Sequence, residues 1–466
     1  MIWMAVAGFL GGWTIPAFAD MLSLKKETLL IALYNGKNRP ELIQLHKPRS
    51  HSPTQSSVPL QESLETTLGT LFHLFVYVYL AGSHLSPKPY ACDGKEPDAP
   101  CGCKKGRPIR MNDALLSSCG NFFHPKRLGL SSAEWSAYWS HHMHAPFEWL
   151  LDLERFNSRT KAPLSEVLKL LHQIKNNGAV FRRLLSLLPH EVIDQSGVKP
   201  MRYMGNHLRV KTFHCDLEKG NSMGGFAGWL PDGGAVWAAG EGSSPSVLKK
   251  WGKPVARHLS REPAVSSGEP LVKVRFFYRR TIKKIVQLPD NREIHSGKLV
   301  GNFQVHFRSG ARVRFHSSGN FFCEPEKKST AIYGLFSINE YVGRVIEREV
   351  ETTPEEAAKA FAVVIRTFLM QNSERSRELL FIKDSPRYQY VSINAPSPEA
   401  MRISAWTDGL IIQGVKPIHY NQKKGSRNSI SWWDAVHQAQ KGLYFDELLK
   451  IAFRSGRIEV MEHRGK

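Results

Sequence analysis

The chain has 466 residues, which at about 100 to 200 residues per domain predicts two or three domains and excludes a single small scaffold. Its 63 lysines and arginines against 42 acidic residues give a formal net charge of +21, so the surface favours polyanionic partners. Apolar residues make up 42% of the chain and aromatic residues 10%, a composition that excludes intrinsic disorder over most of its length.

The first 19 residues, MIWMAVAGFLGGWTIPAFA, carry no charged side chain and end in the small-x-small pattern Ala17-Phe18-Ala19. A signal peptidase can cut such a pattern before Asp20. The run is short for a membrane span and contains Pro16 and glycines. It lacks a basic residue near its start, so an uncleaved anchor or a buried N-terminal segment stays an alternative. We expect export to the periplasm, with cleavage after Ala19, and therefore no nucleic-acid partner for the basic surface.

Six cysteines are compatible with an oxidising compartment; they are Cys92, Cys101, Cys103, Cys119, Cys215 and Cys323. The first three lie in one short loop, CDGKEPDAPCGC. Its spacing is not the repeated Cys-x-x-Cys of a zinc site, so we expect a disulfide there and no metal. Buried thiols are the alternative, and the pairing stays open.

A first module is expected over residues 20–252. It opens on strand-like runs at 28–34 and 41–45, joined by an Asn-Gly turn. The apolar run 68–80 predicts a buried helix. Further helical patterns follow at 112–118, 133–139, 146–155 and 164–188. A glycine-rich strand pair, GGFAGWLPDGGAVWAAG, closes the module, and the composition of residues 253–270 is typical of a linker.

Three motifs of this module resemble those of penicillin-binding proteins and serine β-lactamases. GTLFH matches the start of the nucleophile helix, with Thr70 and His73 at the positions of the nucleophile and its base. ALLSSCGNFF matches the second motif, with Ser118 retained and Gly120 in place of an asparagine. The sequence Lys-Thr-Phe, which begins at Lys211 and Thr212, matches the Lys-Thr-Gly of the edge strand.

Each of these motifs has lost a functional group. Phe213 places a bulky side chain where the family uses glycine to let the substrate backbone approach the strand. We therefore expect an α+β fold: a degenerate serine-transpeptidase/β-lactamase-like domain without catalysis, followed by a second mixed strand and helix domain.

The second module, residues 271–466, begins with strands in which apolar and cationic residues alternate. Eleven lysines or arginines and two acidic residues fall between Leu271 and Arg314. This basic face is either simply solvated or binds a polyanion. In the second case Arg308, Arg312 and Arg314 are the candidate contacts.

Two helices are expected after these strands. The first covers about 338–350. The second is announced by Thr353-Pro354-Glu355-Glu356, a capping-box pattern with proline at the first helical position. Its apolar residues have helical spacing and are expected in the core.

The segments EYVGRVIERE and AAKAFAVVIRTF are similar to the signature of the stage II sporulation protein D (SpoIID) family. Members are peptidoglycan lytic transglycosylases or relatives that enhance amidases. The resemblance implies Glu349 as the catalytic carboxylate and Tyr341, Arg366 and Tyr420 as substrate-binding residues. The family's Met-Pro after its Glu is replaced by Val350-Glu351. Its Cys/His metal-binding segment has no counterpart, so we expect no metal and no cofactor.

One carboxyl group suffices for this chemistry. It protonates the leaving oxygen of the muramyl bond and then, as base, takes the proton of the sugar's 6-hydroxyl while a 1,6-anhydro ring closes. An apolar pocket that raises the carboxyl pKa supports both steps, whereas ordinary hydrolysis needs a second carboxylate. Arg344 and Arg348 would lower the pKa of Glu349 if they lay close to it.

The chain as a whole resembles an exported bacterial family that carries a SpoIID-like domain and is often encoded beside bacterial α2-macroglobulins. The resemblance implies a periplasmic peptidoglycan-binding protein that cleaves glycan strands as a lytic transglycosylase. The alternative is a non-catalytic wall-binding or amidase-enhancing protein that acts with an α2-macroglobulin system. Whether the chain is an enzyme is left open by the sequence.

Overall fold

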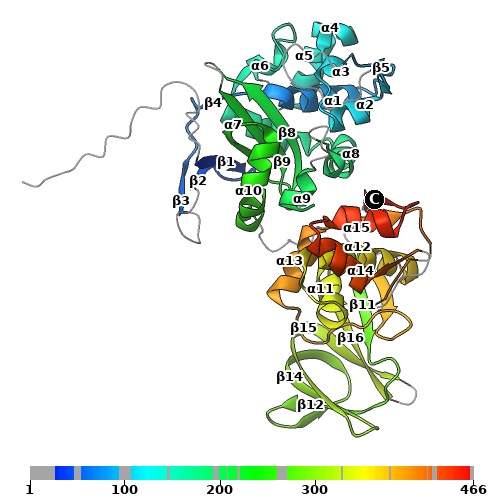
Figure 1. Cartoon of the computed structure of the whole chain (residues 1–466). Helices are drawn as coiled ribbons and strands as arrows, with labels where there is room; N and C mark the ends of the chain where they lie inside the picture. Colours follow the sequence, from blue (N-terminus) through cyan, green and yellow to red (C-terminus); the bar gives the residue numbers. More distant parts are fainter. Residues whose placement is uncertain are drawn as a thin grey trace, which may run out of the picture.

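The structure is a computed structural model in which the described residues are 27–46, 54–93, 106–143, 147–192, 199–206, 208–217, 221–259, 270–326, 329–376, 379–416, 418–421 and 428–461. The expected signal peptide, residues 1–19, lies outside them. No helix in this part of the chain is both long and apolar enough to cross a membrane. Figure 1 shows the chain as two units, each built on its own sheet.

The first unit contains a six-stranded antiparallel sheet of order β3-β2-β1-β10-β9-β8. Its strands are β1 (Thr28–Tyr34), β2 (Glu41–His46), β3 (Thr54–Pro59), β8 (Arg209–Asp216), β9 (Ser222–Trp229) and β10 (Ala235–Glu241). Because side chains alternate along a strand, the sheet contributes to two cores. Leu29 and Ile31 pack with the helix α10 (Ser244–Leu259), while Trp229 and Trp237 pack with the helical part of the unit.

That helical part surrounds α1 (Phe72–Gly82), which the turn η1 (Gly69–Leu71) precedes and whose residues 72–80 are all buried. This confirms the buried helix expected at 68–80. Its neighbours are α2 (Met111–Leu116), α3 (Gly120–Phe123), α4 (Pro125–Leu128), α5 (Ser132–His142), α6 (Glu148–Leu151), α7 (Leu164–Ile174), α8 (Gly178–Leu187), η2 (Leu188–His190) and α9 (Pro200–Met204). The short pairs β4 (Glu65–Thr67) with β7 (Lys161–Pro163) and β5 (Tyr90–Ala91) with β6 (Pro108–Ile109) complete it.

Two helix boundaries differ from expectation. The single helix expected at 164–188 is divided, because the side chain of Asn177 accepts a hydrogen bond from the backbone N–H of Val180 and starts a new helix there. The helix α10 runs to Leu259, so residues 253–259 of the expected linker are helical. The rest of that linker, up to residue 269, lies outside the described residues.

The second unit has an eight-stranded sheet of order β13-β12-β14-β15-β16-β11-β18-β17. Its strands are β11 (Leu271–Phe276), β12 (Ile282–Leu288), β13 (Arg292–Ile294), β14 (Gly297–Phe307), β15 (Arg312–Glu326), β16 (Ser329–Phe336), β17 (Glu374–Arg375) and β18 (Leu379–Lys383). Only the pairing of β11 with β18 is parallel among these. Both units thus combine helices with largely antiparallel sheets, which confirms the α+β class.

The helices of this unit gather at one end of the sheet (Figure 1). They are α11 (Ile338–Glu349), α12 (Glu355–Asn372), α13 (Pro398–Trp406), α14 (Trp432–Gln440) and α15 (Phe445–Ala452), with the small pairs β19 (Leu410–Gln413) and β22 (Arg457–Val460), and β20 (His419–Asn421) and β21 (Ser429–Ser431). The expected capping box of α12 does not form: Pro354 is the N-cap and has no side-chain bond. The carboxylates of Glu355 and Glu356 instead pair with Lys359.

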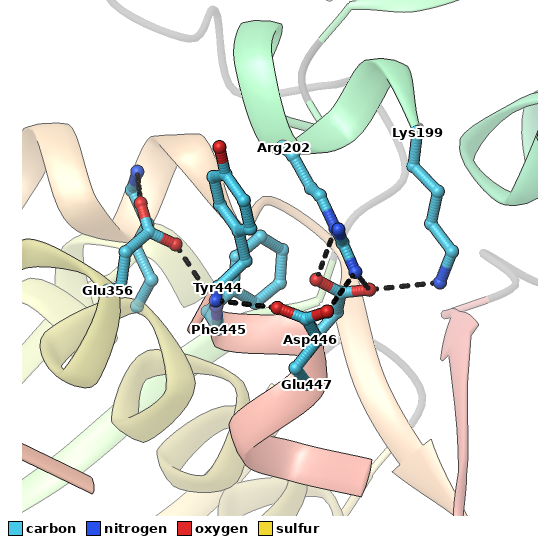
Figure 2. A network of polar contacts seen from close by, with 8 residues as sticks. Lys199, Arg202, Glu356, Tyr444, Phe445, Asp446 and Glu447 are labelled. Carbon is cyan, nitrogen blue, oxygen red and sulfur yellow. Dashed lines mark hydrogen bonds and ion pairs between the residues drawn. The ribbon is translucent and has the colours of Figure 1, made fainter. Parts of the chain in front are cut away.

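The two units meet where α9 faces α15. Asp446 is buried and forms ion pairs with Lys199 and Arg202, each at 2.9 Å (Figure 2). Arg202 also pairs with Glu447 at 3.1 Å, and its guanidinium lies over the ring of Tyr444. These contacts hold the first unit against the helical end of the second unit.

Candidate functional site

Glu349 is the last residue of α11, a helix whose start is capped by the side chain of Ser337. Its carboxylate is half-buried. One oxygen accepts a hydrogen bond from the backbone N–H of Tyr390 at 2.5 Å, and the other accepts one from the hydroxyl of Tyr420. The structure therefore brings together Glu349 and Tyr420, two residues predicted from sequence that lie 71 positions apart.

Burial raises the pKa of Glu349 above its usual range. The hydrogen bonds from Tyr420 and Tyr390 and the charge of Arg348 act in the opposite direction, while the nearby carboxylate of Asp384 adds to the rise. Arg344 does not lower the pKa of Glu349, because its side chain is engaged elsewhere. It pairs with Glu340 at 2.9 Å and donates to the carbonyl oxygens of residues 392–394. A carboxyl with a raised pKa is suited to donate a proton.

Asp384 is the site residue that sequence reasoning missed. It follows β18, and its two oxygens accept hydrogen bonds from the backbone N–H groups of Val391 at 3.1 Å and Phe277 at 3.2 Å. Burial raises its pKa as well. In the sequence, Asp384 differs from other acidic residues only in that it follows a strand, and this position is too common to indicate a functional residue.

Tyr341 lies beneath these carboxylates and does not contact the surface. It is fully buried, and its hydroxyl donates to Oε1 of Gln389 at 2.5 Å. The amide nitrogen of Gln389 donates to the carbonyl oxygen of Ile365 at 3.3 Å. Tyr341 is therefore a positioning residue, and its predicted contact with substrate is wrong.

The predicted substrate contact of Arg366 is also wrong. Its side chain has no exposed surface. It donates to the backbone carbonyl oxygens of Thr407 at 2.7 Å and Ser404 at 3.1 Å, and to Oδ1 of Asn339 at 3.0 Å. Arg366 thus ties α12 to the end of α13 and to the start of α11.

The three arginines Arg308, Arg312 and Arg314 are exposed at the end of the β14–β15 hairpin. The turn between β11 and β12 contacts both this hairpin end and Asp384. At one side of the turn, the carbonyl oxygen of Thr281 accepts a hydrogen bond from the backbone N–H of Arg308 at 3.0 Å. At the other side, the backbone N–H of Phe277 donates to Asp384. The ring of Phe277 packs on Phe307, with ring centroids 5.0 Å apart. The basic hairpin end therefore packs against the turn that contacts Asp384.

Among the described residues, three large aromatic side chains are exposed, those of Tyr278, Tyr390 and Trp433. Tyr390 is 43% exposed and its backbone contacts Glu349; Tyr278 is 40% exposed and follows Phe277. Trp433 is 66% exposed and is the second residue of α14, the helix that follows β21, and β21 pairs with the strand of Tyr420.

In the first unit, the degenerate motifs converge as the resemblance implied. Nζ of Lys211 donates to Oγ of Ser118 and forms an ion pair with Glu191, and both charged groups are completely buried. Burial, and then the charge of Lys211, lower the pKa of His73 well below its usual value. Gly120 is buried at the start of α3. Glu191 was not predicted from sequence, since it lies outside every motif.

The edge of this sheet is closed by side chains. Strand β8 is the edge strand, and the N–H groups of Thr212 and His214 are among those on its outward side. The first donates to Oε2 of Glu191 at 2.9 Å, and the second donates to Oγ1 of Thr70 at 3.2 Å. Phe213 points into the core, where it stacks on Trp237. Glu191 and Thr70, not Phe213 as expected, therefore occupy the edge that a peptide strand would pair with.

No disulfide joins any two of the described cysteines, which are Cys92, Cys119, Cys215 and Cys323. Cys101 and Cys103 lie outside the described residues, so the bridge expected in their loop stays a prediction. In the same part of the chain, no group of three or more His, Cys, Asp or Glu side chains is arranged to hold a metal ion.

Comparison with known proteins agrees with these two units. Residues 326–411 match the SpoIID family, described as "Stage II sporulation protein". The chain is 33% identical over 455 residues to the "Uncharacterized protein YfaQ" of Escherichia coli (strain K12), a match that covers 97% of this chain and 80% of the relative.

Solved structures match about half of the chain. The transpeptidase domain of the FtsI4 D,D-transpeptidase from Legionella pneumophila aligns with 50% of this chain and 88% of its own, at 9% identity and a TM-score of 0.30. A class D β-lactamase from Bacillus subtilis aligns with 51% and 93%, at 11% identity and a TM-score of 0.32. The assignment of a transpeptidase-like first unit rests on the sheet order and on the convergence of the three motifs described above.

Proposed function

Because the chain belongs to the family of the Escherichia coli protein YfaQ and contains a SpoIID match at residues 326–411, we propose that it is a peptidoglycan-binding protein that cleaves glycan strands as a lytic transglycosylase. The observation that carries the proposal is the environment of Glu349: a half-buried carboxyl with a raised pKa, held by Tyr420 and the backbone of Tyr390.

In this mechanism Glu349 is the general acid and then the general base. Protonated, it donates its proton to the glycosidic oxygen as the bond to the muramyl C1 breaks. The resulting carboxylate takes the proton of the 6-hydroxyl, whose oxygen closes the 1,6-anhydro ring on C1. The hydroxyl of Tyr420 and the N–H of Tyr390 keep the carboxyl fixed through both steps.

The role of Asp384 favours ring closure over hydrolysis. A hydrolase uses its second carboxylate to activate water or to attack the sugar. Both oxygens of Asp384 accept backbone N–H groups, from Val391 and Phe277, so this carboxyl is fixed as part of the loop structure. Burial raises the pKa of Glu349, and the negative charge of Asp384 adds to this rise.

The surroundings suit an amino-sugar polymer. The exposed rings of Tyr278, Tyr390 and Trp433 can stack on sugar faces, because pyranose rings present apolar C–H surfaces. The exposed arginines of the β14–β15 hairpin can hold anionic groups of the wall. In the proposed setting the first unit binds or orients the wall without transpeptidation, since its sheet edge is closed by Glu191 and Thr70.

Export to the periplasm and action with a bacterial α2-macroglobulin system belong to this proposal. They are supported only by the resemblances drawn from the sequence. A non-catalytic wall-binding or amidase-enhancing role is the outcome if Glu349 does not cleave.

The test compares three forms of the purified protein on peptide-stripped glycan strands: wild type, Glu349→Gln and the control Glu347→Gln. Glu347 is exposed on the same helix and accepts a bond from the backbone of Ser397, which glutamine can still accept. Wild type and Glu347→Gln should release 1,6-anhydro ends at similar rates. Glu349→Gln should be slower by about 100-fold or more. Equally low release by all three would reject cleavage.

A further inference from the structure

A row of basic side chains crosses the second sheet where β12, β14 and β15 lie, at the end away from the helices (Figure 1). Lys284 of β12 is paired with His306 of β14, and His306 is paired with Arg312 of β15. Directly paired residues project from the same face of a sheet, with Cβ atoms about 4.5–5.5 Å apart. Because the neighbouring residues Val305 and Val313 pack in or against the core, the basic row lies on the opposite face.

Gln304 connects this row to a further cation. Its Oε1 accepts a hydrogen bond from Nε of Arg314 at 3.0 Å, and its amide nitrogen lies 3.2 Å from Nε2 of His306. Since an amide nitrogen is a donor, Nε2 of His306 accepts, and the neutral imidazole carries its hydrogen on Nδ1. Gln304 is only 7% exposed, so this bridge is held within the sheet. It fixes the guanidinium of Arg314 and the ring of His306 beside each other.

The positive charges of this face are not compensated by the protein. In the described part of the chain, no ion pair joins Lys284, Arg312 or Arg314 to an acidic side chain. The register places Glu293 of β13 on the same face, but its carboxylate lies 3.9 Å from Nδ1 of His295. Like charges on paired positions destabilise a sheet. A bound anion would offset this cost.

The number of positive charges indicates which anion fits best. A carboxylate brings one negative charge and two acceptor oxygens. A phosphomonoester brings a charge of about −1.5 to −2 near pH 7 and three acceptor oxygens. Burial, and then the charges of Arg312, Lys284 and Lys283, lower the pKa of His306, so its ring is neutral at pH 7 and contributes a hydrogen-bond donor. Three cations and one neutral donor therefore suit a phosphomonoester better than a carboxylate.

We propose that Lys284, Arg312 and Arg314, together with His306, bind the phosphomonoester group of a phosphorylated sugar. A lipid phosphate is less suited, because Val300 is the only exposed large apolar residue of β12, β14 and β15 among those described, and binding in a bilayer interface uses several. The sugar as carrier rests on the proposed function, in which anionic groups of the wall meet this hairpin. Binding of the phosphate does not depend on cleavage by Glu349.

The test is isothermal titration calorimetry on the full-length protein with glucose 6-phosphate and, separately, with glucuronic acid. Cosedimentation with vesicles of phosphatidylcholine and phosphatidic acid tests the lipid source. The variants are Arg312→Gln and Arg314→Gln, which remove one charge each from exposed positions. The control Arg457→Gln removes the same charge from an exposed position on β22, in the same unit. Melting temperatures show that the variants fold.

Glucose 6-phosphate should bind, and Arg312→Gln and Arg314→Gln should each weaken this binding about tenfold or more, as expected for a lost charge-assisted hydrogen bond. Arg457→Gln should bind as wild type does, and glucuronic acid should bind more weakly than the phosphate. The proposal is overturned if glucose 6-phosphate does not bind, if Arg457→Gln weakens binding as much as the other variants, if glucuronic acid binds equally well, or if only the vesicles bind.

This test is independent of the proposed cleavage. Glucose 6-phosphate contains no glycosidic bond to a second sugar, so its binding is measured without any reaction at Glu349. A protein that binds the phosphate but releases no 1,6-anhydro ends would contradict the cleavage proposal alone. A protein that releases these ends but does not bind the phosphate would contradict the phosphate site alone.

Discussion

Glu349 illustrates what a sequence pattern can and cannot reveal about one residue. Its spacing from the Glu-Tyr-Val segment identified it, and the contact with Tyr420 agrees with that choice. The same resemblance named Tyr341 and Arg366 as substrate contacts, yet both are buried. A motif identifies positions but not the direction in which a side chain points, because that depends on packing against segments far away in the sequence.

Asp384 could not be predicted for a related reason. Its effect on Glu349 depends on the loop that follows β18, which folds back so that Val391 donates to it. No pattern in the sequence around Asp384 predicts that the loop folds back to bring Val391 next to it. Charge near a catalytic group is a property of the three-dimensional arrangement, and it sets the pKa only after folding.

The raised pKa of Glu349 has a consequence for stability. Because its pKa is higher in the folded state, this group favours folding at low pH, and the contribution is lost as the pH rises through the folded pKa. Glu349→Gln should therefore raise the melting temperature relative to wild type more at pH 7.5 than at pH 4. Thermal unfolding at the two pH values checks this. The same difference at both would show that the carboxyl is not destabilised by burial.

In the first unit, the outward N–H groups of Thr212 and His214 on the edge strand β8 are already bonded to side chains, so they are not available to pair with a peptide strand. The residues of the three matched motifs lie together in the fold: Lys211 contacts Ser118, and His214 contacts Thr70 in the turn before α1. The closing of the edge by Glu191 was invisible in the sequence, since this residue lies between helices and outside the motifs. Helix α1 was predictable because its apolar run is continuous, whereas the break between α7 and α8 depends on one cap.

The buried pair of Lys211 and Glu191 should behave as a unit. Lys211→Met leaves the Glu191 carboxylate buried without its cation and should cost about 3–5 kcal/mol in the free energy of unfolding. The double variant with Glu191→Gln should recover part of this loss, because no charge then remains uncompensated. Urea denaturation of the two single variants and the double variant measures the coupling. Additive losses would contradict a paired role.

For the whole molecule, the two units were expected from length and composition, but their contact was not. The docking of α9 against α15 uses Lys199 and Arg202 on one side and Asp446 on the other, residues some 245 positions apart. Burial alone would raise the pKa of Asp446, but the charges and hydrogen bonds of Lys199 and Arg202 outweigh it and hold the pKa below its usual value.

This docking should depend on pH. A carboxyl whose pKa is lowered by folding stabilises above its unfolded pKa of about 3.9, and the contribution is lost as the pH falls through the folded pKa. Asp446→Asn should therefore lose about 2–3 kcal/mol at pH 7, with little difference from wild type near pH 2. The control Glu447→Gln, whose side chain is 40% exposed, should change stability by less than about 1 kcal/mol. A loss in Asp446→Asn that does not vary with pH would contradict the ion-pair account.

We propose that Glu349 breaks the muramyl glycosidic bond and that the sugar's own 6-hydroxyl replaces the leaving group. Glycan strands digested in H₂¹⁸O and analysed by mass spectrometry test it directly. If the 6-hydroxyl closes the ring, the new ends carry no ¹⁸O and lack the mass of one water, and Glu349→Gln does not form them. New ends that carry ¹⁸O would show hydrolysis and contradict the account, as would an absence of new ends with wild type.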